Sequence, residues 1–168
     1  MQSLEELSTV LGEALQARGW QLALAESCTG GMVAQAITAI AGSSAWFDRG
    51  FVTYSNAAKT DMLDVPDSLI EAHGAVSEPV AQAMASGALE RSVASISGAV
   101  TGIAGPGGGS AQKPVGTVCF GWAVNSNSAG ASRSITETRY FEGNRAAVRQ
   151  QAASHLLAGL LKLAKETD

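Results

Sequence analysis

The sequence predicts an α/β protein, a three-layer α/β/α sandwich around a mixed, mostly parallel sheet of about five strands. Short apolar runs of strand length alternate with segments of helical periodicity, which favours parallel strands connected by helices. The last two apolar runs are joined by the polar segment 125–130, which is too short for a crossover helix, so these strands should be antiparallel neighbours. At 168 residues we expect one domain over residues 1–168.

The first half of the chain should begin with a helix and continue with two strand–turn–helix units. Ser3 and Glu6 have the spacing of a capping box, and apolar residues recur at helical spacing as far as Gly19, a C-terminal stop. Asn56 has the position of an N-cap. The expected elements are a helix from residue 4 to Gly19, a strand at 20–25, a helix at 32–40, a strand at 51–55, a short helix at 57–63 and another short helix after Pro66.

The second half should contain two longer helices and three strands. Ser77-Glu78-Pro79 is typical of a helix start. The alternating side chains of residues 133–141 suit an edge strand with one wet face. The expected elements are a helix at 80–91, strands at 94–100, 115–124 and 133–141, and a long C-terminal helix capped by Asn144. In such folds ligands bind beyond the carboxyl ends of the parallel strands, where two glycine clusters lie.

Composition and charge exclude several classes of protein. Lys and Arg number 11 against 15 Asp and Glu, so the net charge is −4, whereas a nucleic-acid groove needs clustered cations. Two cysteines, Cys28 and Cys119, cannot build a disulfide framework or a four-ligand zinc site. Because there is no signal peptide and no apolar run of about 20 residues, we expect a cytoplasmic protein without a membrane partner.

The first group of candidate functional residues is Ser27-Cys28-Thr29-Gly30-Gly31, between a predicted strand and a predicted helix. Three of these side chains could act as nucleophiles. Free N–H groups and the positive end of the helix dipole favour the binding of an anion or an oxyanion at this position, and the glycines permit its close approach to the backbone. An ordinary N-cap with packing glycines would look the same in sequence.

Lys59 strengthens the catalytic interpretation. With Asn56 as the N-cap, Lys59 would be the third residue of its helix, where a cation faces the positive end of the dipole. The same field disfavours the ammonium form of Lys59, and an amine has to be neutral to act as a general base near neutral pH. Ser27 and Lys59 would then be nucleophile and base, with Tyr54 able to relay or stabilise the proton. The alternative is an exposed lysine and a packed tyrosine.

Other catalytic groups fit less well. The sequence has no Gly-x-Ser-x-Gly elbow, and its two histidines are His73, in an expected loop, and His155, inside the last helix. His155 is more typical of a surface or packing residue than of a base. Cys28 has suitable spacing for a nucleophile, but a cytosolic cysteine just inside a helix is more often a small buried hydrophobic residue.

The second glycine cluster runs from Thr101 through Gly102 and Gly105 to Gly109. It lacks the ending of a Walker loop, and it is followed by a strand rather than by the helix of a dinucleotide fingerprint. Its N–H groups could cradle a phosphate, or it could be a flexible connection. Arg145 is the first residue of the last helix, so its positive charge lies, like that of Lys59, at the positive end of a helix dipole. An anion between the two would remove this repulsion, which favours a substrate that carries a phosphate.

Six blocks of the sequence, in order, resemble the nicotinamide-nucleotide amidases, a family also called NMN deamidases or CinA C-terminal domain proteins. The blocks are residues 26–31, 42–47, 53–59, 73–77, 101–106 and 113–118. The resemblance covers essentially the whole chain, which would then be a single CinA C-terminal-like amidase domain. One departure is Asn144, where the family usually has Asp: capping survives, but a negative charge is lost.

The resemblance implies hydrolysis of the carboxamide of nicotinamide mononucleotide (NMN) to nicotinate mononucleotide and ammonia, in pyridine-nucleotide recycling. It implies Ser27, Tyr54 and Lys59 as the catalytic positions. No metal and no cofactor are expected, and the expected assembly is a homo-oligomer, a dimer. The expected substrate contacts are Glu26, Cys28, Thr29, Gly30, Gly31, Thr101, Gly102, Gly105 and Arg145.

The expected mechanism is acyl transfer. Lys59 takes the Ser27 proton, Ser27 attacks the carboxamide carbon, and N–H groups at the start of the Ser27 helix hold the oxyanion. Two other functions remain open: a non-catalytic nucleotide-binding module that acts as a sensor or binds a partner, and an amidase for a non-nucleotide amide. The family is also associated with competence and DNA damage, but an acidic chain without a basic stripe gives DNA binding little support.

Overall fold

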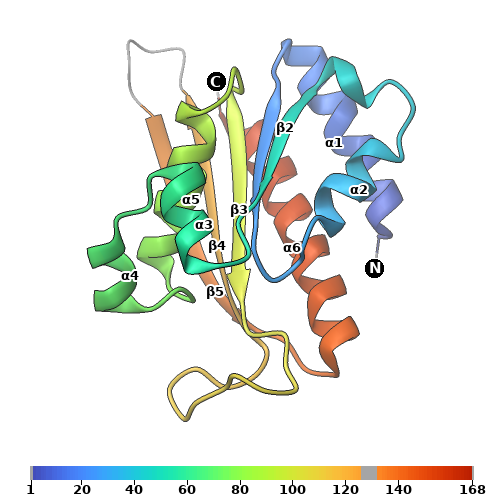
Figure 1. Ribbon diagram of the computed structural model, residues 1–168. Helices are drawn as coiled ribbons and strands as arrows, with labels where there is room; N and C mark the ends of the chain where they lie inside the picture. Colours follow the sequence, from blue (N-terminus) through green and yellow to red (C-terminus); the bar gives the residue numbers. More distant parts are fainter. Residues whose placement is uncertain (1, 126–131, 168) are drawn as a thin grey trace.

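The computed structural model describes residues 2–125 and 132–167, and it shows a five-stranded sheet between two layers of helices (Figure 1). The strand order is β2-β1-β3-β4-β5. The parallel strands are β1 (Leu22–Glu26), β2 (Phe47–Val52) and β3 (Ile96–Gly102), whereas β4 (Thr117–Asn125) and β5 (Ser132–Tyr140) continue the sheet with two antiparallel pairings. The predicted α/β sandwich with an antiparallel final pair is confirmed. Most of the predicted 125–130 connection, from residue 126 on, lies outside the described residues.

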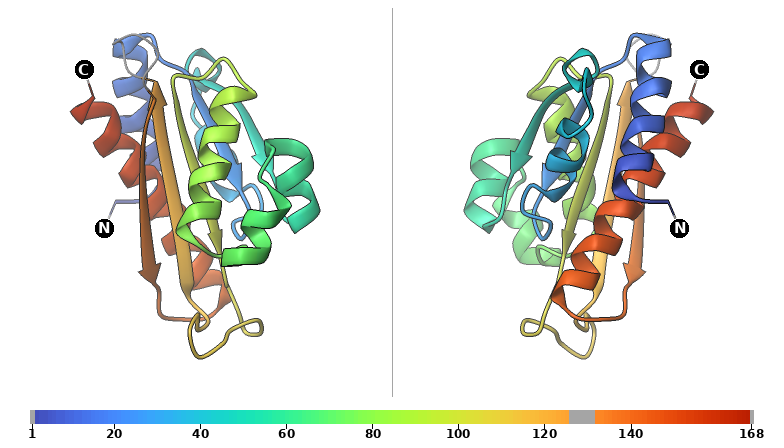
Figure 2. Two further views of the ribbon diagram at one scale, coloured as in Figure 1. Left: turned by 90° about the vertical axis from the view of Figure 1, so that its left-hand side faces the viewer. Right: turned by 90° about the vertical axis from the view of Figure 1, so that its right-hand side faces the viewer.

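The helices cover opposite faces of the sheet (Figure 2). One layer contains α1 (Leu4–Arg18), α2 (Met32–Thr38) and α6 (Arg145–Glu166), and the other contains α3 (Asn56–Leu63), α4 (Asp67–His73) and α5 (Glu78–Glu90). A short 3-10 helix, η1 (Ser43–Ala45), precedes β2. None of the described helices combines the length and the apolar character needed to cross a membrane.

β1 is the central element of the core. All of its residues are buried, because helices cover both of its faces. Leu22 and Leu24 pack in the core beneath α1 and α6, whereas Ala23 and Ala25 pack in the core beneath α5. The continuous apolar run that predicted this strand is therefore typical of a parallel strand buried on both sides.

Helix ends follow the capping signals in the sequence. The Ser3 and Glu6 capping box is present at the start of α1, and Gly19 ends that helix in a left-handed conformation. Asn144 caps α6 as predicted, with its side-chain oxygen accepting the Ala147 N–H at 2.9 Å. His73, expected in a loop, is instead the last residue of α4.

The prediction for the second strand was wrong. It was expected at 51–55, but β2 starts at Phe47 and includes Asp48, Arg49 and Gly50, which interrupt the apolar pattern. β2 tolerates these residues because it lies at an edge of the sheet.

The shift of β2 also changes the start of α3. Ser55, not Asn56, is its N-cap, and the Ser55 hydroxyl accepts the Ala58 N–H at 3.0 Å. Lys59 is consequently the fourth helical residue rather than the third, although it still lies in the first turn.

The topology places the two glycine clusters at the same end of the sheet, where β1 and β3 terminate; this is the lower end in Figure 1. Ser27 follows the carboxyl end of β1, and Gly102 ends its parallel neighbour β3. The prediction that both clusters follow parallel strands at their carboxyl ends is confirmed.

Gly121 in β4 should be essential for the packing of α5 on the sheet. A Cβ at this position would lie 2.4 Å from the backbone oxygen of Ala81, which cannot rotate away. We expect Gly121→Ala to lower the free energy of unfolding by about 1–3 kcal/mol, the usual cost of overpacking. Urea unfolding measures this difference. Gly107→Ala is the control, because its Cβ would meet no atom within 4 Å; equal losses in both variants would contradict the packing argument.

Candidate active site

A cavity of about 310 Å³ opens at the carboxyl ends of β1 and β3 and brings together most of the predicted site residues. Those that line it are Ser27, Cys28, Tyr54, Lys59, Thr101, Gly102, Gly105 and Arg145. Glu26, Thr29, Gly30 and Gly31 do not line it. Asn56, Ala75 and Val76 also line this cavity, although the sequence analysis did not name them as site residues.

Ser27 and Lys59 are in direct contact in this cavity. The backbone N–H of Ser27 donates to Val100 of β3 at 3.0 Å, which fixes the residue at the end of the sheet. From the first turn of α3, Lys59 places its Nζ 3.0 Å from Ser27 Oγ and 3.0 Å from the Thr53 carbonyl oxygen. Both side chains are buried, with Ser27 only 7% and Lys59 only 1% exposed.

Burial changes the acid–base character of Lys59. Desolvation lowers the pKa of its amine from the usual 10.5, because an ammonium group loses more hydration energy than a neutral amine. Among the ion pairs of the described residues, none joins Lys59 to an acidic side chain. A neutral Lys59 can accept the hydroxyl proton of Ser27, so this pair has the geometry of a nucleophile and its base.

Cys28 lies next to this pair, but its thiol is poorly suited to attack. Burial is the main cause that raises the pKa of Cys28 to about 12, so the thiol stays protonated near neutral pH. The thiolate is the nucleophilic form of cysteine. Cys28 is also a member of the hydrophobic core, as the sequence predicted for a small buried residue.

Glu26 is turned away from the cavity and caps α2. Its Oε1 accepts the Thr29 hydroxyl at 2.6 Å and the Val33 N–H at 3.0 Å, and its Oε2 accepts the Ala34 N–H at 3.0 Å. The carboxylate therefore satisfies the N–H groups that a helix start leaves without partners. The expectation that this first turn is free to hold an oxyanion was wrong, because Glu26 already occupies it.

Gly30 and Gly31 shape the turn between β1 and α2. Their φ angles are +58° and +107°, in the left-handed region that favours glycine. These conformations allow the chain to reverse directly after Ser27, so that α2 starts next to the end of β1. Their role in the structure is backbone geometry next to the site.

Arg149 of α6 holds the same turn, and the sequence analysis missed it. Its Nε donates to the Cys28 carbonyl at 3.1 Å and its Nη2 to the Thr29 carbonyl at 3.0 Å. These bonds fix the backbone directly after Ser27. A signal was present in the sequence, because Arg149 follows Arg145 by one helical turn and both must project from the same face of α6.

Arg145 joins the glycine-rich loop to Tyr54. Its Nη1 donates to the Gly105 carbonyl at 2.7 Å, and its Nη2 donates to the Tyr54 hydroxyl at 3.2 Å. Tyr54 is 61% exposed, and within residues 2–125 and 132–167 its hydroxyl bonds to neither Ser27 nor Lys59. Thr101 is buried and donates to the Ala75 carbonyl at 3.0 Å, which ties the end of β3 to the segment before α5.

The capping role of Glu26 can be tested by replacing its carboxylate with an amide. In Glu26→Gln an NH₂ group would face backbone N–H donors, so we expect the free energy of unfolding to fall by about 1–3 kcal/mol. Glu6→Gln is the matched control, because Glu6 makes a similar bond to Ser3 at an exposed helix start. The control should change stability by less than about 0.5 kcal/mol in urea unfolding. An equally small effect at Glu26 would refute the capping role.

Comparisons with known proteins identify the family of this chain. The family model of the CinA C-terminal domain matches residues 4–164. The chain is 55% identical to the nicotinamide-nucleotide amidohydrolase PncC of Enterobacter agglomerans, over 95% of this chain and 94% of the relative. It is 52% identical to the protein of the same name from Escherichia coli strain K12, over 94% of this chain and 92% of that relative.

A solved structure has the same fold. The crystal structure of the competence/damage inducible protein CihA from Agrobacterium tumefaciens matches with a TM-score of 0.88 at 45% sequence identity. The match covers 97% of this chain and 96% of that chain. Since the family model and these relatives each span nearly the whole chain, the protein belongs to the CinA C-terminal domain family.

Proposed function

We propose that this protein is an amidohydrolase that converts NMN to nicotinate mononucleotide and ammonia, with Ser27 as nucleophile and Lys59 as its base. The observation that carries the proposal is the 3.0 Å contact between Ser27 Oγ and the buried Lys59 Nζ. The substrate class comes from the relatives, since proteins 55% and 52% identical to this chain are named nicotinamide-nucleotide amidohydrolases.

The first half-reaction forms an ester on Ser27. Neutral Lys59 takes the hydroxyl proton while Oγ attacks the carboxamide carbon, and negative charge develops on the carboxamide oxygen. The Thr53 carbonyl, 3.0 Å from Nζ, stabilises the ammonium that forms on Lys59. That ammonium then protonates the leaving nitrogen, the C–N bond breaks, and ammonia departs.

The second half-reaction uses the same two side chains. Lys59, neutral again, takes a proton from the water that attacks the ester carbon. The C–O bond to Ser27 then breaks, and Lys59 returns the proton to Oγ. One amide and one water give one carboxylic acid and one ammonia, so no further reactant is required.

Backbone groups beside Ser27 are the proposed site for the oxyanion. Because Glu26 occupies the N–H groups of Val33 and Ala34, other donors are needed. The N–H groups of Cys28 and Thr29 follow Ser27 directly, and among the described residues neither of them bonds to a backbone carbonyl. Arg149 holds the carbonyls of the same two residues, so it would keep these donors in place before the substrate arrives.

The glycine-rich loop and Arg145 are the proposed site for the phosphate of NMN. Ala104, Gly105, Gly107 and Gly108 line the cavity together with Arg145. In the proposal, backbone N–H groups of this loop and the Arg145 guanidinium hold the phosphate. Cys28, Thr101 and Gly102 line the same cavity and complete the proposed substrate contacts. For Tyr54 to assist proton transfer, its hydroxyl would have to turn from Arg145 toward the leaving nitrogen.

Ammonia release is the experiment that tests this function. The purified protein is incubated with NMN and, separately, with simple amides such as benzamide. Release from NMN is the expected result. Release only from simple amides would identify an amidase for another class of substrate. Release from none of them, with NMN binding detected by calorimetry, would identify a nucleotide-binding module.

Two variants distinguish the candidate nucleophiles. Ser27→Ala should abolish ammonia release while NMN binding is largely retained, because the variant removes only the attacking oxygen. Cys28→Ala should keep most activity, because the Cys28 thiol is protonated and packed in the core. The opposite pattern, with an active Ser27→Ala and an inactive Cys28→Ala, would assign the nucleophile to the thiol.

The base can be tested through pH and through the Arg variant. Only neutral Lys59 accepts a proton, so kcat/KM for NMN should rise with pH and level off above the lowered pKa of Lys59. The midpoint should lie below the 10.5 of an ordinary lysine. Lys59→Arg places a permanent cation at this position that does not deprotonate, so it should be as inactive as Lys59→Ala. Turnover like that of the wild type in Lys59→Arg would remove Lys59 from the mechanism.

The phosphate assignment predicts a strong preference for the nucleotide. Nicotinamide riboside lacks the phosphate, so its kcat/KM should be about ten- to a hundred-fold lower than that of NMN. Arg145→Ala should narrow this gap by reducing kcat/KM for NMN selectively. Equal values for the two substrates in the wild-type protein would show that the loop does not bind the phosphate.

A further inference from the structure

Two segments without helix or strand structure form part of the wall of the Ser27 cavity. The connection between α4 and α5, residues 74–77, contributes Ala75 and Val76. The glycine-rich loop between β3 and β4 contributes Ala104, Gly105, Gly107 and Gly108. Segments of this kind are mobile unless other groups hold their backbone. The side chains that bond to these two segments therefore determine the shape of the cavity.

Side-chain donors hold the connection between α4 and α5. Three successive carbonyls, from the last residue of α4 onward, each accept one hydrogen bond from a side chain. The donors are Lys113 Nζ to His73 at 2.7 Å, the Ser77 hydroxyl to Gly74 at 2.8 Å, and the Thr101 hydroxyl to Ala75 at 3.0 Å. Ser77 belongs to the connection itself and Thr101 to β3, whereas Lys113 belongs to the glycine-rich loop. Lys113 thus joins the two wall segments directly.

The same lysine holds the far end of the glycine-rich loop. Among the described residues, two hydrogen bonds join residues 104–113 to other parts of the fold. One runs from Arg145 to the Gly105 carbonyl, and the other runs from Lys113 to the His73 carbonyl. The backbone of Lys113 is itself part of a turn, since its carbonyl accepts the Ser110 N–H at 2.8 Å and its N–H donates to the Ser110 hydroxyl at 3.0 Å. The Lys113 side chain therefore fixes where this turn lies.

The surroundings of the Lys113 ammonium match this contact. Gly74 has a φ of +81°, and a Cβ there would lie 3.1 Å from Lys113 Nζ, so the glycine leaves room for the ammonium. The last carbonyls of a helix lack partners within the helix, and a lysine is a favourable donor to them. Among the ion pairs of the described residues, none includes Lys113. Its charge is directed to a carbonyl of α4 rather than to a carboxylate.

We propose that Lys113 is a positioning residue for the glycine-rich loop. Its bond to the His73 carbonyl holds the loop against the connection between α4 and α5 and fixes the two wall segments relative to each other. Lys113 does not line the cavity, so it acts through the loop and not on the substrate. Backbone N–H groups bind a phosphate more tightly when they are already in place. The effect on phosphate binding rests on the proposed function, whereas the effect on the loop does not.

Amide hydrogen exchange of the full chain without substrate tests the contact. Lys113→Met removes the ammonium and retains an unbranched stem. At short labelling times, peptides that contain residues 73–77 or 103–113 should exchange about three- to ten-fold faster in this variant. The peptide that contains Ser27 should not change. Lys113→Arg should exchange like the wild type, because a guanidinium also donates to a carbonyl.

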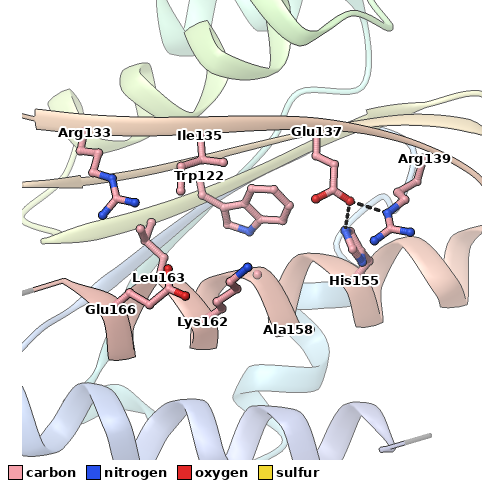
Figure 3. A pocket seen from close by; sticks show the side chains of 11 residues that line it. Trp122, Arg133, Ile135, Glu137, Arg139, His155, Ala158, Lys162, Leu163 and Glu166 are labelled. Atoms are coloured by element: carbon pink, nitrogen blue, oxygen red, sulfur yellow. Dashed lines mark hydrogen bonds and ion pairs between the residues drawn. The ribbon is translucent and has the colours of Figure 1, made fainter.

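Lys162→Met is the matched control, because it removes a lysine from another part of the surface. Lys162 lies on α6, and Figure 3 shows it beside the groove between β5 and α6. None of the residues that line this groove also lines the Ser27 cavity. Exchange in residues 73–77 and 103–113 should therefore be the same in Lys162→Met as in the wild type.

Kinetics test the consequence for the substrate. In Lys113→Met the KM for NMN should rise about three- to ten-fold, because the loop binds the phosphate less well. The kcat should stay within about two-fold, because the Ser27 and Lys59 contact does not involve Lys113. For nicotinamide riboside, which has no phosphate, kcat/KM should be nearly unchanged. Lys113→Arg should restore the KM for NMN.

The two measurements separate this proposal from the proposed function. Unchanged exchange in Lys113→Met, or equally fast exchange in Lys162→Met, would overturn the role of Lys113 in holding the loop. A lower kcat with an unchanged KM, or an equal loss for the riboside, would overturn its role in phosphate binding. A wild type that releases no ammonia from NMN would refute the proposed function, and the exchange measurement would still decide whether Lys113 holds the loop.

Discussion

The buried amine of Lys59 is the constraint on which the candidate site depends. A lysine that is 1% exposed and bonded only to a hydroxyl and a carbonyl is costly to keep charged. The fold therefore favours the neutral amine, and it places that amine 3.0 Å from Ser27 Oγ. In the proposed mechanism, a low-polarity environment and a short contact make this pair of side chains a nucleophile and its base. Desolvation is the main cause of the lowered pKa of Lys59.

The rest of the structure holds the Ser27 side of this contact. β1 is buried on both faces and ends next to β3, so the backbone of Ser27 has a fixed position. Glu26 anchors the start of α2 from within the core, and Arg149 holds the two carbonyls that follow Ser27. α6 thus contributes to both sides of the cavity, since Arg145 reaches the glycine-rich loop one turn before Arg149. These contacts fix the backbone N–H groups beside Ser27 in advance, as stabilisation of the charge that develops on a carboxamide oxygen requires.

Local signals in the sequence predicted the layer architecture, the N-caps of α1 and α6 and the antiparallel pair, because each depends on neighbouring residues. They also selected Ser27 and Lys59 as candidate site residues, since a lysine in the first turn of a helix contradicts the usual preference for a carboxylate there, and the structure brings the two side chains into contact. The polar residues of β2 concealed that strand, because an edge position allows them. The role of Glu26 was not predictable, because it depends on the side to which its carboxylate turns. The spacing of Arg145 and Arg149 indicated a shared helix face, but it did not reveal that Arg149 bonds to carbonyl groups far away in the chain.

Trapping of the acyl-enzyme is the most direct test of the Ser27 and Lys59 pair. The protein is mixed with NMN, quenched with acid while turnover proceeds, digested, and analysed by mass spectrometry. An ester of nicotinate mononucleotide on the peptide that contains Ser27, confined to that residue by fragmentation and absent from Ser27→Ala, is the predicted result. A nicotinate mononucleotide thioester on Cys28, or turnover of NMN by the wild type without any covalent intermediate, would contradict it.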